Sequence, residues 1–181
     1  RSSQRVHAPA DRARTVRMVL GVADYMLGRP GRTVLDVGAG EGHWYPVLRR
    51  IRPSIRYAGV DPSEYAVARY GRSRNLRLGT LGDIPAALTR RRYDLIVCSG
   101  MLNYVSRTEL RSGLAQLAEL ARGVAFLELF TARDDVHGDT RGRRRASVYR
   151  ALLRDLGFRH CGPHCYVGPR FAGTVAEMEI G

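Results

Sequence analysis

A strand-like run that ends in a glycine cluster constrains this chain more than any other feature of its sequence. Residues 34–42 read VLDVGAGEG, an apolar run with one acid, Asp36, followed by three glycines within five residues. The run predicts a buried parallel strand, and the glycines predict a turn that brings bare backbone close to a ligand. The spacing is GxGxG, whereas the dinucleotide fingerprint keeps its strand apolar up to GxGxxG. Asp36 therefore argues against a nicotinamide oxidoreductase.

Strand-like and helix-like patterns alternate on both sides of this turn. Apolar residues at helical spacing predict helices at 12–27, 44–52, 110–120 and around 149–156, and a further helix that begins near 64. Short apolar runs predict strands at 33–37, 55–60, 76–79, 93–98, 123–130, 158–167 and 173–180. Ser106 and Glu109 have the spacing of a capping box. This order predicts one α/β domain, with a doubly wound, mostly parallel, seven-stranded Rossmann-like sheet and helices on both faces.

The basic residues of the chain show a strong bias. All 30 of them are arginine, and the net charge is +13. The absence of lysine indicates a coding bias, and the scatter of the arginines favours a solvated basic surface, while nucleic acid stays open as a partner. No apolar run approaches the roughly 20 residues that span a bilayer, and the N-terminus lacks the apolar core of a secretion signal. We therefore expect a cytoplasmic protein without a membrane segment.

The three cysteines do not form a disulfide framework. Cys98 ends an apolar run and is expected to be a small buried hydrophobe. His160-Cys161 and His164-Cys165 could together supply four zinc ligands. However, adjacent His-Cys pairs point to opposite faces of an extended segment. This arrangement favours a structural or substrate-facing loop, and we expect no metal.

Polar residues follow the predicted parallel strands at their carboxyl ends, where ligands bind in an open sheet. Asp61 follows the second strand, and its carboxylate can accept two hydrogen bonds from a ribose diol. Asp83 and Ile84 follow the third, where an acid could receive an adenine amino proton and an apolar side chain could pack on the ring. The alternative is that Asp61 and Asp83 only cap helices. Their recurrence after successive strands, downstream of the glycine turn, favours a ligand.

Five segments in this order resemble the motifs of class I S-adenosylmethionine-dependent methyltransferases. They read VLDVGAGEG, GVDPSEYAV, LGDIP, YDLIVCSGMLNYV and GVAFLELF, and they extend the resemblance over roughly residues 30–180. A GD…YR…GF…C pattern within 138–161 is similar to small bacterial Rossmann-like methyltransferases. The resemblance implies one methyltransferase domain over 1–181, with a helical lid segment at 1–30 and a cofactor-binding core at 31–181.

The same resemblance implies S-adenosylmethionine as the cofactor and assigns residues to it. Asp36 and the glycine turn would hold its amino-acid portion, Asp61 its ribose, and Asp83 its adenine. The cofactor-binding residues implied in this way are Asp36, Gly38, Ala39, Gly40, Asp61, Pro62, Asp83, Ile84, Ser99 and Gly100.

The turn after the fourth strand limits the expected substrates. It reads CSGM at 98–101, whereas enzymes that methylate exocyclic base amines resemble one another in an Asn/Asp-Pro-Pro-aromatic turn. Asn103 stands alone there, so a catechol-type magnesium site is not expected. We expect methyl transfer to an oxygen or nitrogen atom of a small molecule. The alternatives are an RNA methyltransferase that uses the arginine-rich surface, and a non-catalytic cofactor-binding partner subunit.

Methyl transfer from a sulfonium is an in-line displacement, and a base helps by removing the proton of the acceptor. The candidate catalytic residues are His137 and His164, with Tyr104 as an orienting group. Each also has an ordinary interpretation, as a loop, turn or packing residue. The charged loop 131–143 follows the fifth strand, and we expect it to form part of a lid in which His137 or Asp139 faces the acceptor.

Overall fold

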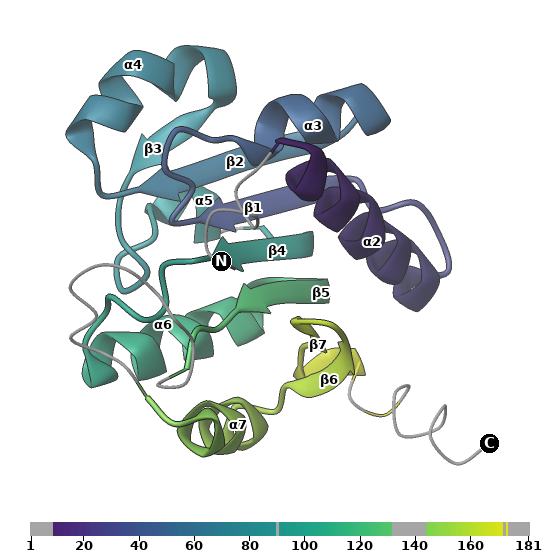
Figure 1. The fold of residues 1–181 in the computed structure, drawn as a ribbon, viewed down its shortest axis with the longest axis vertical. Coiled ribbons are helices and arrows are strands. Elements are labelled where there is room, and N and C mark those ends of the chain that lie inside the picture. The colour runs from purple at the N-terminus through teal and green to yellow at the C-terminus, as the bar shows by residue number, and fades with distance from the viewer. Residues whose placement is uncertain (1–8, 90, 132–143, 172, 174–181) are drawn as a thin grey trace.

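One sheet forms the centre of the molecule (Figure 1). The computed structural model describes residues 9–89, 91–131, 144–171 and 173. The strands of the described residues are β1 (Thr33–Val37), β2 (Arg56–Asp61), β3 (Leu76–Leu78), β4 (Tyr93–Ser99), β5 (Ala121–Glu128), β6 (Arg159–Gly162) and β7 (Cys165–Val167). The helices are α2 (Pro9–Leu27), α3 (Trp44–Ile51), α4 (Glu64–Arg74), α5 (Ala86–Thr89), α6 (Arg107–Leu120), α7 (Ala146–Asp155) and the 3-10 turn η1 (Pro169–Phe171).

The strand order is β3-β2-β1-β4-β5-β7-β6. Strands β1 to β5 pair in parallel, whereas β7 pairs antiparallel with both β5 and β6. The chain runs outward from β1 to β3 and then returns to place β4 on the other side of β1. This reversal leaves a crevice beyond the carboxyl ends of β1 and β4, where α/β sheets bind ligands. The predicted doubly wound, mostly parallel, seven-stranded sheet is confirmed.

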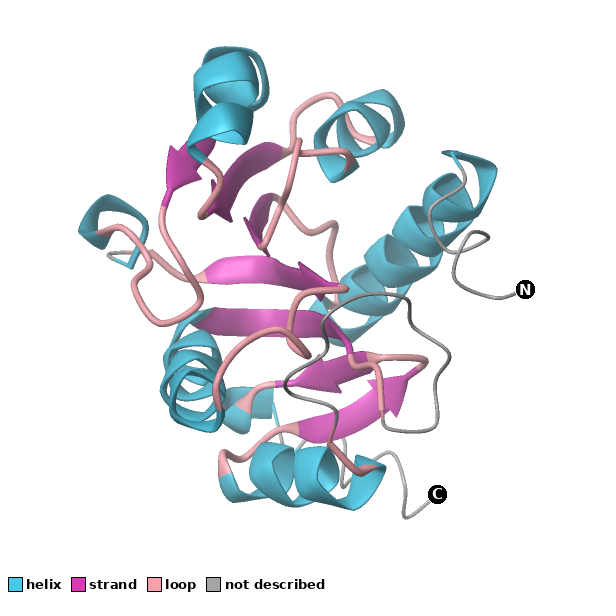
Figure 2. Ribbon diagram, turned by 60° about the vertical axis from the view of Figure 1, so that its left-hand side comes forward, coloured by secondary structure: helices cyan, strands magenta, loops and turns pink. Residues whose placement is uncertain are grey.

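Helices cover both faces of the sheet, as Figure 2 shows. Successive residues of a strand point to opposite faces, so Val34 and Leu35 of β1 enter different cores. The core around Val34 includes residues of α2 and α3, and the core around Leu35 includes residues of α6 and α7. Burial on both faces explains why β1 and β4 read as almost continuous apolar runs.

Helix α2 is one of the layers of the domain. Its side chains Val16, Val19 and Ala23 are fully buried, and the helix contacts β4 and β5. At its end, the Asp24 carboxylate accepts hydrogen bonds from the Arg52 guanidinium at 2.9 and 2.5 Å. The segment 1–30, expected as a lid, thus contributes a core helix, and its first eight residues lie outside the described residues. Within the described ranges, no helix is both long and apolar enough to cross a membrane.

Side-chain caps begin two of these helices. The Ser106 hydroxyl accepts a hydrogen bond from the Glu109 backbone N–H at 3.1 Å, which confirms the cap predicted for α6. Ser63 caps α4 in the same way, through the N–H of Ala66 at 3.2 Å. Asn75 ends α4 in the left-handed conformation, with φ of 51°. The element boundaries next to the crevice are therefore set by local sequence.

Two predicted strands differ from the structure by more than one residue. β5 begins at Ala121, directly after α6, and ends at Glu128, two residues earlier at each end than predicted. The prediction of one strand over 158–167 is wrong, because Gly162 and His164 reverse the chain within it and produce the hairpin β6–β7. The strand predicted at 173–180 lies, apart from its first residue, outside the described residues.

A buried acid at the amino edge of the sheet is held by several donors. Asp94 of β4 is 1% exposed and accepts hydrogen bonds from the Arg29 guanidinium at 2.8 and 3.3 Å and from the Arg32 N–H at 2.7 Å. Burial alone would raise the pKa of Asp94, but these donors lower it below its ordinary value. Because the pKa of Asp94 is lower in the folded protein than in the unfolded chain, the ionised carboxylate stabilises the fold at pH values above the unfolded-state pKa. This stabilisation is lost as the pH falls through the pKa of the folded state.

We expect Asp94→Asn to lower the free energy of unfolding by about 2–4 kcal/mol at pH 7, because it removes the charge of a buried carboxylate that accepts hydrogen bonds from Arg29 and Arg32. Urea unfolding measures this loss. Arg122→Ala is the matched control, since Arg122 lies 4.0 Å from the same carboxylate but its side chain is 55% exposed. Its expected cost is below about 1 kcal/mol. Equal costs for the two variants, or a cost of Asp94→Asn that persists undiminished at pH 3, would contradict this account.

Candidate functional site

The glycine turn after β1 is held by hydrogen bonds to β2. The N–H groups of Gly38 and Ala39 donate to the carbonyl oxygen of Val60 at 2.8 and 3.0 Å. Gly38 and Gly40 have φ values of 74° and 55°, which favour glycine. At Gly40 an added Cβ would meet no atom within 4 Å, so the backbone faces open space. The turn therefore presents bare backbone at the carboxyl edge of the sheet.

Asp36, two residues before this turn, is a buried acid that is 1% exposed. One carboxylate oxygen, Oδ2, accepts a hydrogen bond from the Tyr57 hydroxyl of β2 at 2.7 Å, and Oδ1 has no such partner among the described residues. Burial raises the pKa of Asp36 to about 7; the Tyr57 hydrogen bond opposes this shift, and the charge of Asp61 adds to it. A cationic donor of a bound ligand at Oδ1 would favour the ionised form.

Asp61 connects the ends of β1 and β2. Its carboxylate accepts hydrogen bonds from the Gly40 N–H at 2.6 Å and from the Ser63 N–H at 2.9 Å. Ser63, and not Asp61, supplies the side-chain cap of α4. The interpretation of Asp61 as a simple helix cap is therefore wrong. Its carboxylate instead fixes the glycine turn beside the crevice.

A cavity of about 170 Å³ lies at this edge of the sheet. It is bordered by the first turns of α2, the glycine turn, the start of α3, and the ends of β4 and β5. The residues that line it are Arg12, Thr15, Asp36, Gly38, Ala39, Gly40, His43, Trp44, Ser99, Phe126 and Glu128.

A second buried acid, Glu128, belongs to this cavity. It is 7% exposed and accepts a hydrogen bond from the Ser99 hydroxyl at 2.5 Å, and the two residues are register partners of β5 and β4. Sequence reasoning missed Glu128, because the strand predicted at 123–130 placed it inside the strand. The sequence pattern that identified Asp61, an acid at the carboxyl end of a parallel strand, is also present at Glu128.

The structure brings half of the predicted cofactor residues together around the cavity. Those that line it are Asp36, Gly38, Ala39, Gly40 and Ser99. Pro62 and Asp83 are exposed in the loops after β2 and β3. Ile84 is 4% exposed and belongs to a core, so little of its surface is open to a ring. Gly100 has φ of 71° in the turn after β4. Their contact with a cofactor stays a prediction.

The candidate catalytic residues lie in different places. His137 and Asp139 are outside the described residues. Tyr104 is 51% exposed and is not among the residues that line the cavity. His164 is exposed in the turn between β6 and β7, and its ring meets the Phe126 ring edge-on with centroids 6.0 Å apart. Through Phe126, which lines the cavity, His164 lies close to the site.

The cysteines of the β6–β7 hairpin behave as packing residues. Burial raises the pKa of Cys161 to about 11 and that of Cys165 to about 12, so both remain thiols at neutral pH. In the part of the chain that the structure describes, no group of three or more His, Cys, Asp or Glu side chains is arranged to hold a metal ion.

The reversed parallel sheet, with its acid and glycine turn at the crevice, defines a Rossmann-like domain that binds a cofactor at its carboxyl edge. A family profile for the methyltransferase domain matches residues 11–171. The chain belongs to this methyltransferase family, which confirms the expected class of enzyme. A comparison with curated protein sequences finds no match.

Several solved structures, among them named methyltransferases, share the fold. DesVI from Streptomyces venezuelae is 15% identical, with 88% of this chain and 91% of that chain covered and a TM-score of 0.65. Magnesium protoporphyrin IX methyltransferase from Synechocystis PCC 6803, with bound SAH, is 22% identical over 83% of this chain and 74% of that one, with a TM-score of 0.62. The plantazolicin methyltransferase BpumL, in complex with a pentazolic desmethylPZN analog and SAH, is 15% identical over 82% and 64%, with a TM-score of 0.68.

Proposed function

We propose that this chain transfers a methyl group from S-adenosylmethionine to an oxygen or nitrogen atom of a small molecule. The observation that carries the proposal is the glycine turn after β1, which lines the cavity together with Asp36 and is held by the Asp61 carboxylate through the Gly40 N–H at 2.6 Å. The similar structures that contain SAH act, by their names, on a porphyrin and on plantazolicin, which supports a small-molecule acceptor.

The residues present fit the cofactor. Asp36 Oδ1 can accept a hydrogen bond from its ammonium group, and the open space at Gly40 allows its close approach. Each oxygen of the Asp61 carboxylate accepts one backbone N–H and keeps a second lone pair that a ribose hydroxyl can use. When bound, S-adenosylmethionine supplies an electrophilic methyl group.

We assign the removal of the acceptor proton to Glu128. Its carboxylate lines the cavity, and the Ser99 hydroxyl holds one of its oxygens in place. The side chain can take the proton of an acceptor hydroxyl or ammonium group at a carboxylate oxygen. Because Glu128 is almost fully buried, little water competes for that oxygen. His164 and His137 remain second candidates for this role.

Glu128→Gln is expected to lower kcat more than tenfold, since the amide keeps the shape of the side chain but accepts protons poorly. Affinity for S-adenosylmethionine should stay within about threefold of the wild type, because the cofactor contacts proposed above do not involve Glu128. Glu119→Gln, an exposed residue of α6, is the matched control. Unchanged turnover of the Glu128→Gln variant would move the base to one of the histidines.

Binding of the cofactor tests the function directly. We expect mass spectrometry of the purified protein to detect S-adenosylmethionine or its demethylated product, and calorimetry to show binding of S-adenosylmethionine but not of NAD. Binding of NAD alone would overturn the proposal. Acceptors are then screened with the labelled methyl donor: label in RNA would identify an RNA methyltransferase, and binding without transfer to any acceptor would identify a cofactor-binding partner subunit.

The raised pKa of Asp36 has a consequence for the stability of the cofactor-free protein. Between pH 4 and 7 the folded state holds a proton on Asp36 that the unfolded state releases, so stability falls as the pH rises. The expected slope approaches 1.4 kcal/mol per pH unit in this window. Urea unfolding of Asp36→Asn should lack this contribution, whereas the control Asp11→Asn, in the first turn of α2, should keep it. Parallel pH profiles for the wild type and Asp36→Asn would contradict the raised pKa.

A further inference from the structure

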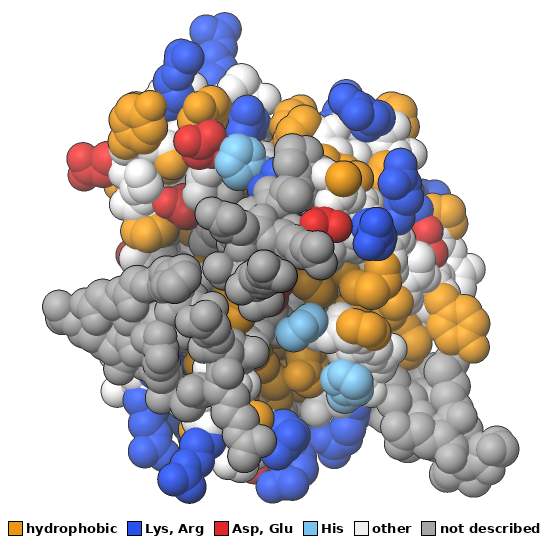
Figure 3. Space-filling view, in the orientation of Figure 1, with side chains coloured by type: hydrophobic (Ala, Val, Ile, Leu, Met, Phe, Trp, Pro, Cys, Tyr) orange, Lys and Arg blue, Asp and Glu red, His pale blue; other side chains and the backbone are white. Residues whose placement is uncertain are grey.

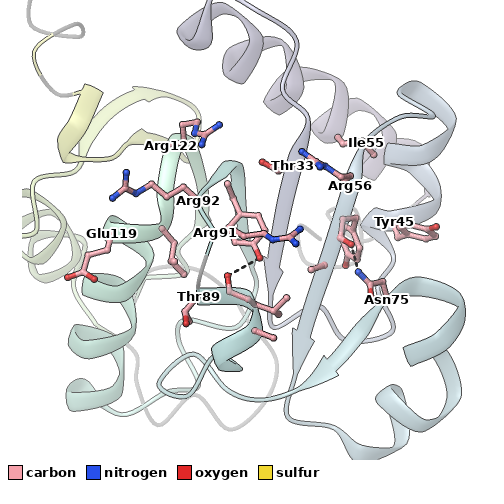
Figure 4. Close-up of a pocket in the computed structure, with 16 residues that line it drawn as sticks. Thr33, Tyr45, Ile55, Arg56, Asn75, Thr89, Arg91, Arg92, Glu119 and Arg122 are labelled. Atoms are coloured by element: carbon pink, nitrogen blue, oxygen red, sulfur yellow. Dashed lines mark hydrogen bonds between the residues drawn. The ribbon is translucent and has the colours of Figure 1, made fainter.

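A second and larger hollow lies at the opposite, amino edge of the sheet (Figure 4). Its volume is about 1160 Å³, and it is bordered by the starts of β1, β2 and β4, by α5, and by the junction of α6 with β5. Its charged lining residues are Arg56, Arg91, Arg92, Arg122 and Glu119. Among the described residues, the lining of the hollow therefore carries four guanidinium groups and one carboxylate.

Strand topology brings these arginines together. Arg56 begins β2, Arg91 and Arg92 precede β4, and Arg122 is the second residue of β5. In a parallel sheet the amino ends of all strands meet at one edge, so arginines that are distant in sequence share one hollow. In Figure 4, Arg91 extends across the hollow toward β1 and β2, while Arg92 extends the other way, toward α6.

Three of these guanidinium groups have no acidic partner in the described part of the chain. All four arginines are exposed, and within that part Arg56, Arg91 and Arg92 form no ion pair, while Arg122 reaches Asp94 only at 4.0 Å. Figure 3 shows basic side chains spread around one face of the molecule, without a continuous stripe. The hollow differs, because four arginines and one described carboxylate line the same space, so it attracts an anion.

The lining favours phosphates on a chain over a small phosphorylated ligand. A planar guanidinium pairs with phosphate through two parallel hydrogen bonds. No glycine is among the described lining residues, so the hollow lacks the backbone cradle that small phosphate sites use. Tyr45 lies half-buried at the margin, with its ring tilted by 51° against Tyr57, and offers an aromatic surface for a base.

We propose that this hollow binds the backbone of a single-stranded nucleic acid, with phosphates at Arg56, Arg91 and Arg122 and a base against Tyr45. The hollow and the cavity at Asp36 lie at opposite edges of the sheet. A strand bound in the hollow is therefore a docking partner, and its bases there are not the methyl acceptors. This binding does not depend on the reaction proposed above.

Fluorescence anisotropy with a labelled twelve-nucleotide oligouridylate tests the proposal. Three neutralised phosphates predict a slope of about −2 for the logarithm of affinity against the logarithm of salt concentration. The variant Arg56→Ala/Arg91→Ala/Arg122→Ala should bind at least tenfold more weakly and lose most of this slope. The control Arg72→Ala/Arg111→Ala/Arg154→Ala removes the same charge from exposed helix positions and should change affinity less than threefold. Equal losses in the two variants would overturn the site in favour of diffuse attraction.

Further measurements separate folding and other ligands from this result. Thermal unfolding of both triple variants checks the fold, and Arg91→Glu, a single change in a loop, tests the hollow if the triple variant does not fold. Tyr45→Leu should weaken binding about fivefold without changing the salt slope. Displacement of the oligonucleotide by tripolyphosphate or by polyglutamate at equal concentration of charge would overturn the assignment to a nucleic-acid strand.

Discussion

Gly38→Ala is expected to weaken binding of S-adenosylmethionine by at least tenfold. Gly38 has φ of 74°, a conformation that costs a residue with a Cβ about 1–2 kcal/mol. In addition, the new Cβ would lie 2.4 Å from Cγ of Met101, which follows β4, so that Met101 must move or the turn must open. Either change displaces backbone that lines the cavity. Calorimetry with the cofactor measures the loss.

Gly28→Ala is the matched control for this prediction. Gly28 follows α2 with φ of 61°, and an added Cβ there would meet no atom within 4 Å. Both variants share the cost of the backbone conformation, but only Gly38→Ala alters the cavity. Adding Met101→Ala to Gly38→Ala should restore part of the affinity, since it removes the contacted Cγ. Equal cofactor affinity in the Gly38 and Gly28 variants would show that the turn does not approach the cofactor.

Asp61→Ala is expected to weaken cofactor binding by about 1.5–3 kcal/mol, which corresponds to roughly ten- to a hundredfold. The substitution removes the proposed acceptor of the ribose hydroxyls and also releases the Gly40 N–H, which Asp61 holds at 2.6 Å. The loss therefore has a direct part and a part that comes from the glycine turn. Asp61→Asn keeps one acceptor oxygen and should lie between the wild type and the alanine variant.

Glu64→Ala serves as the control, because Glu64 is an exposed acid in the first turn of α4, three residues further along the chain. Glu64→Ala should leave the affinity for the cofactor unchanged. This result would show that a negative charge near β2 is not sufficient for cofactor binding. Urea unfolding verifies that Asp61→Ala is folded. A folded Asp61→Ala variant with wild-type affinity would show that neither the proposed ribose contact nor the hold on the glycine turn contributes to cofactor binding.

The spacing of apolar residues, glycines and helix caps along the sequence predicted most of the fold. β1 was predicted at its observed bounds, because a short apolar run closed by glycines has few alternatives in a parallel sheet. The Ser106 cap of α6 was equally local, since the residues involved are three positions apart. The β6–β7 hairpin was missed because residues 158–167 look like one strand until Gly162 and His164 adopt positive φ.

The candidate site could be predicted only in part. Asp36 and Gly38 belong to one continuous motif, so their nearness to each other needed no tertiary structure. Glu128 was missed because its position at the end of β5, and not inside it, depends on where α6 ends. Ile84 was expected to pack on a ring, and the structure buries it in a core. Such burial is decided by neighbouring elements that local sequence does not reveal.

The alternation of strands and helices, the glycine turn and the acids after the strands could all be predicted from consecutive residues. These features depend on local backbone conformation and on the pattern of burial along the chain. The tertiary structure alone decided which of these groups meet. It placed Tyr57 against Asp36, Asp61 against Gly40 and Ser99 against Glu128. Each of these contacts joins a strand to the neighbouring strand or to the turn that follows it, so the order β2-β1-β4-β5 determines which of these groups meet. The same order gathers the arginines at the opposite edge, because the pairing of strands fixes which ends become neighbours.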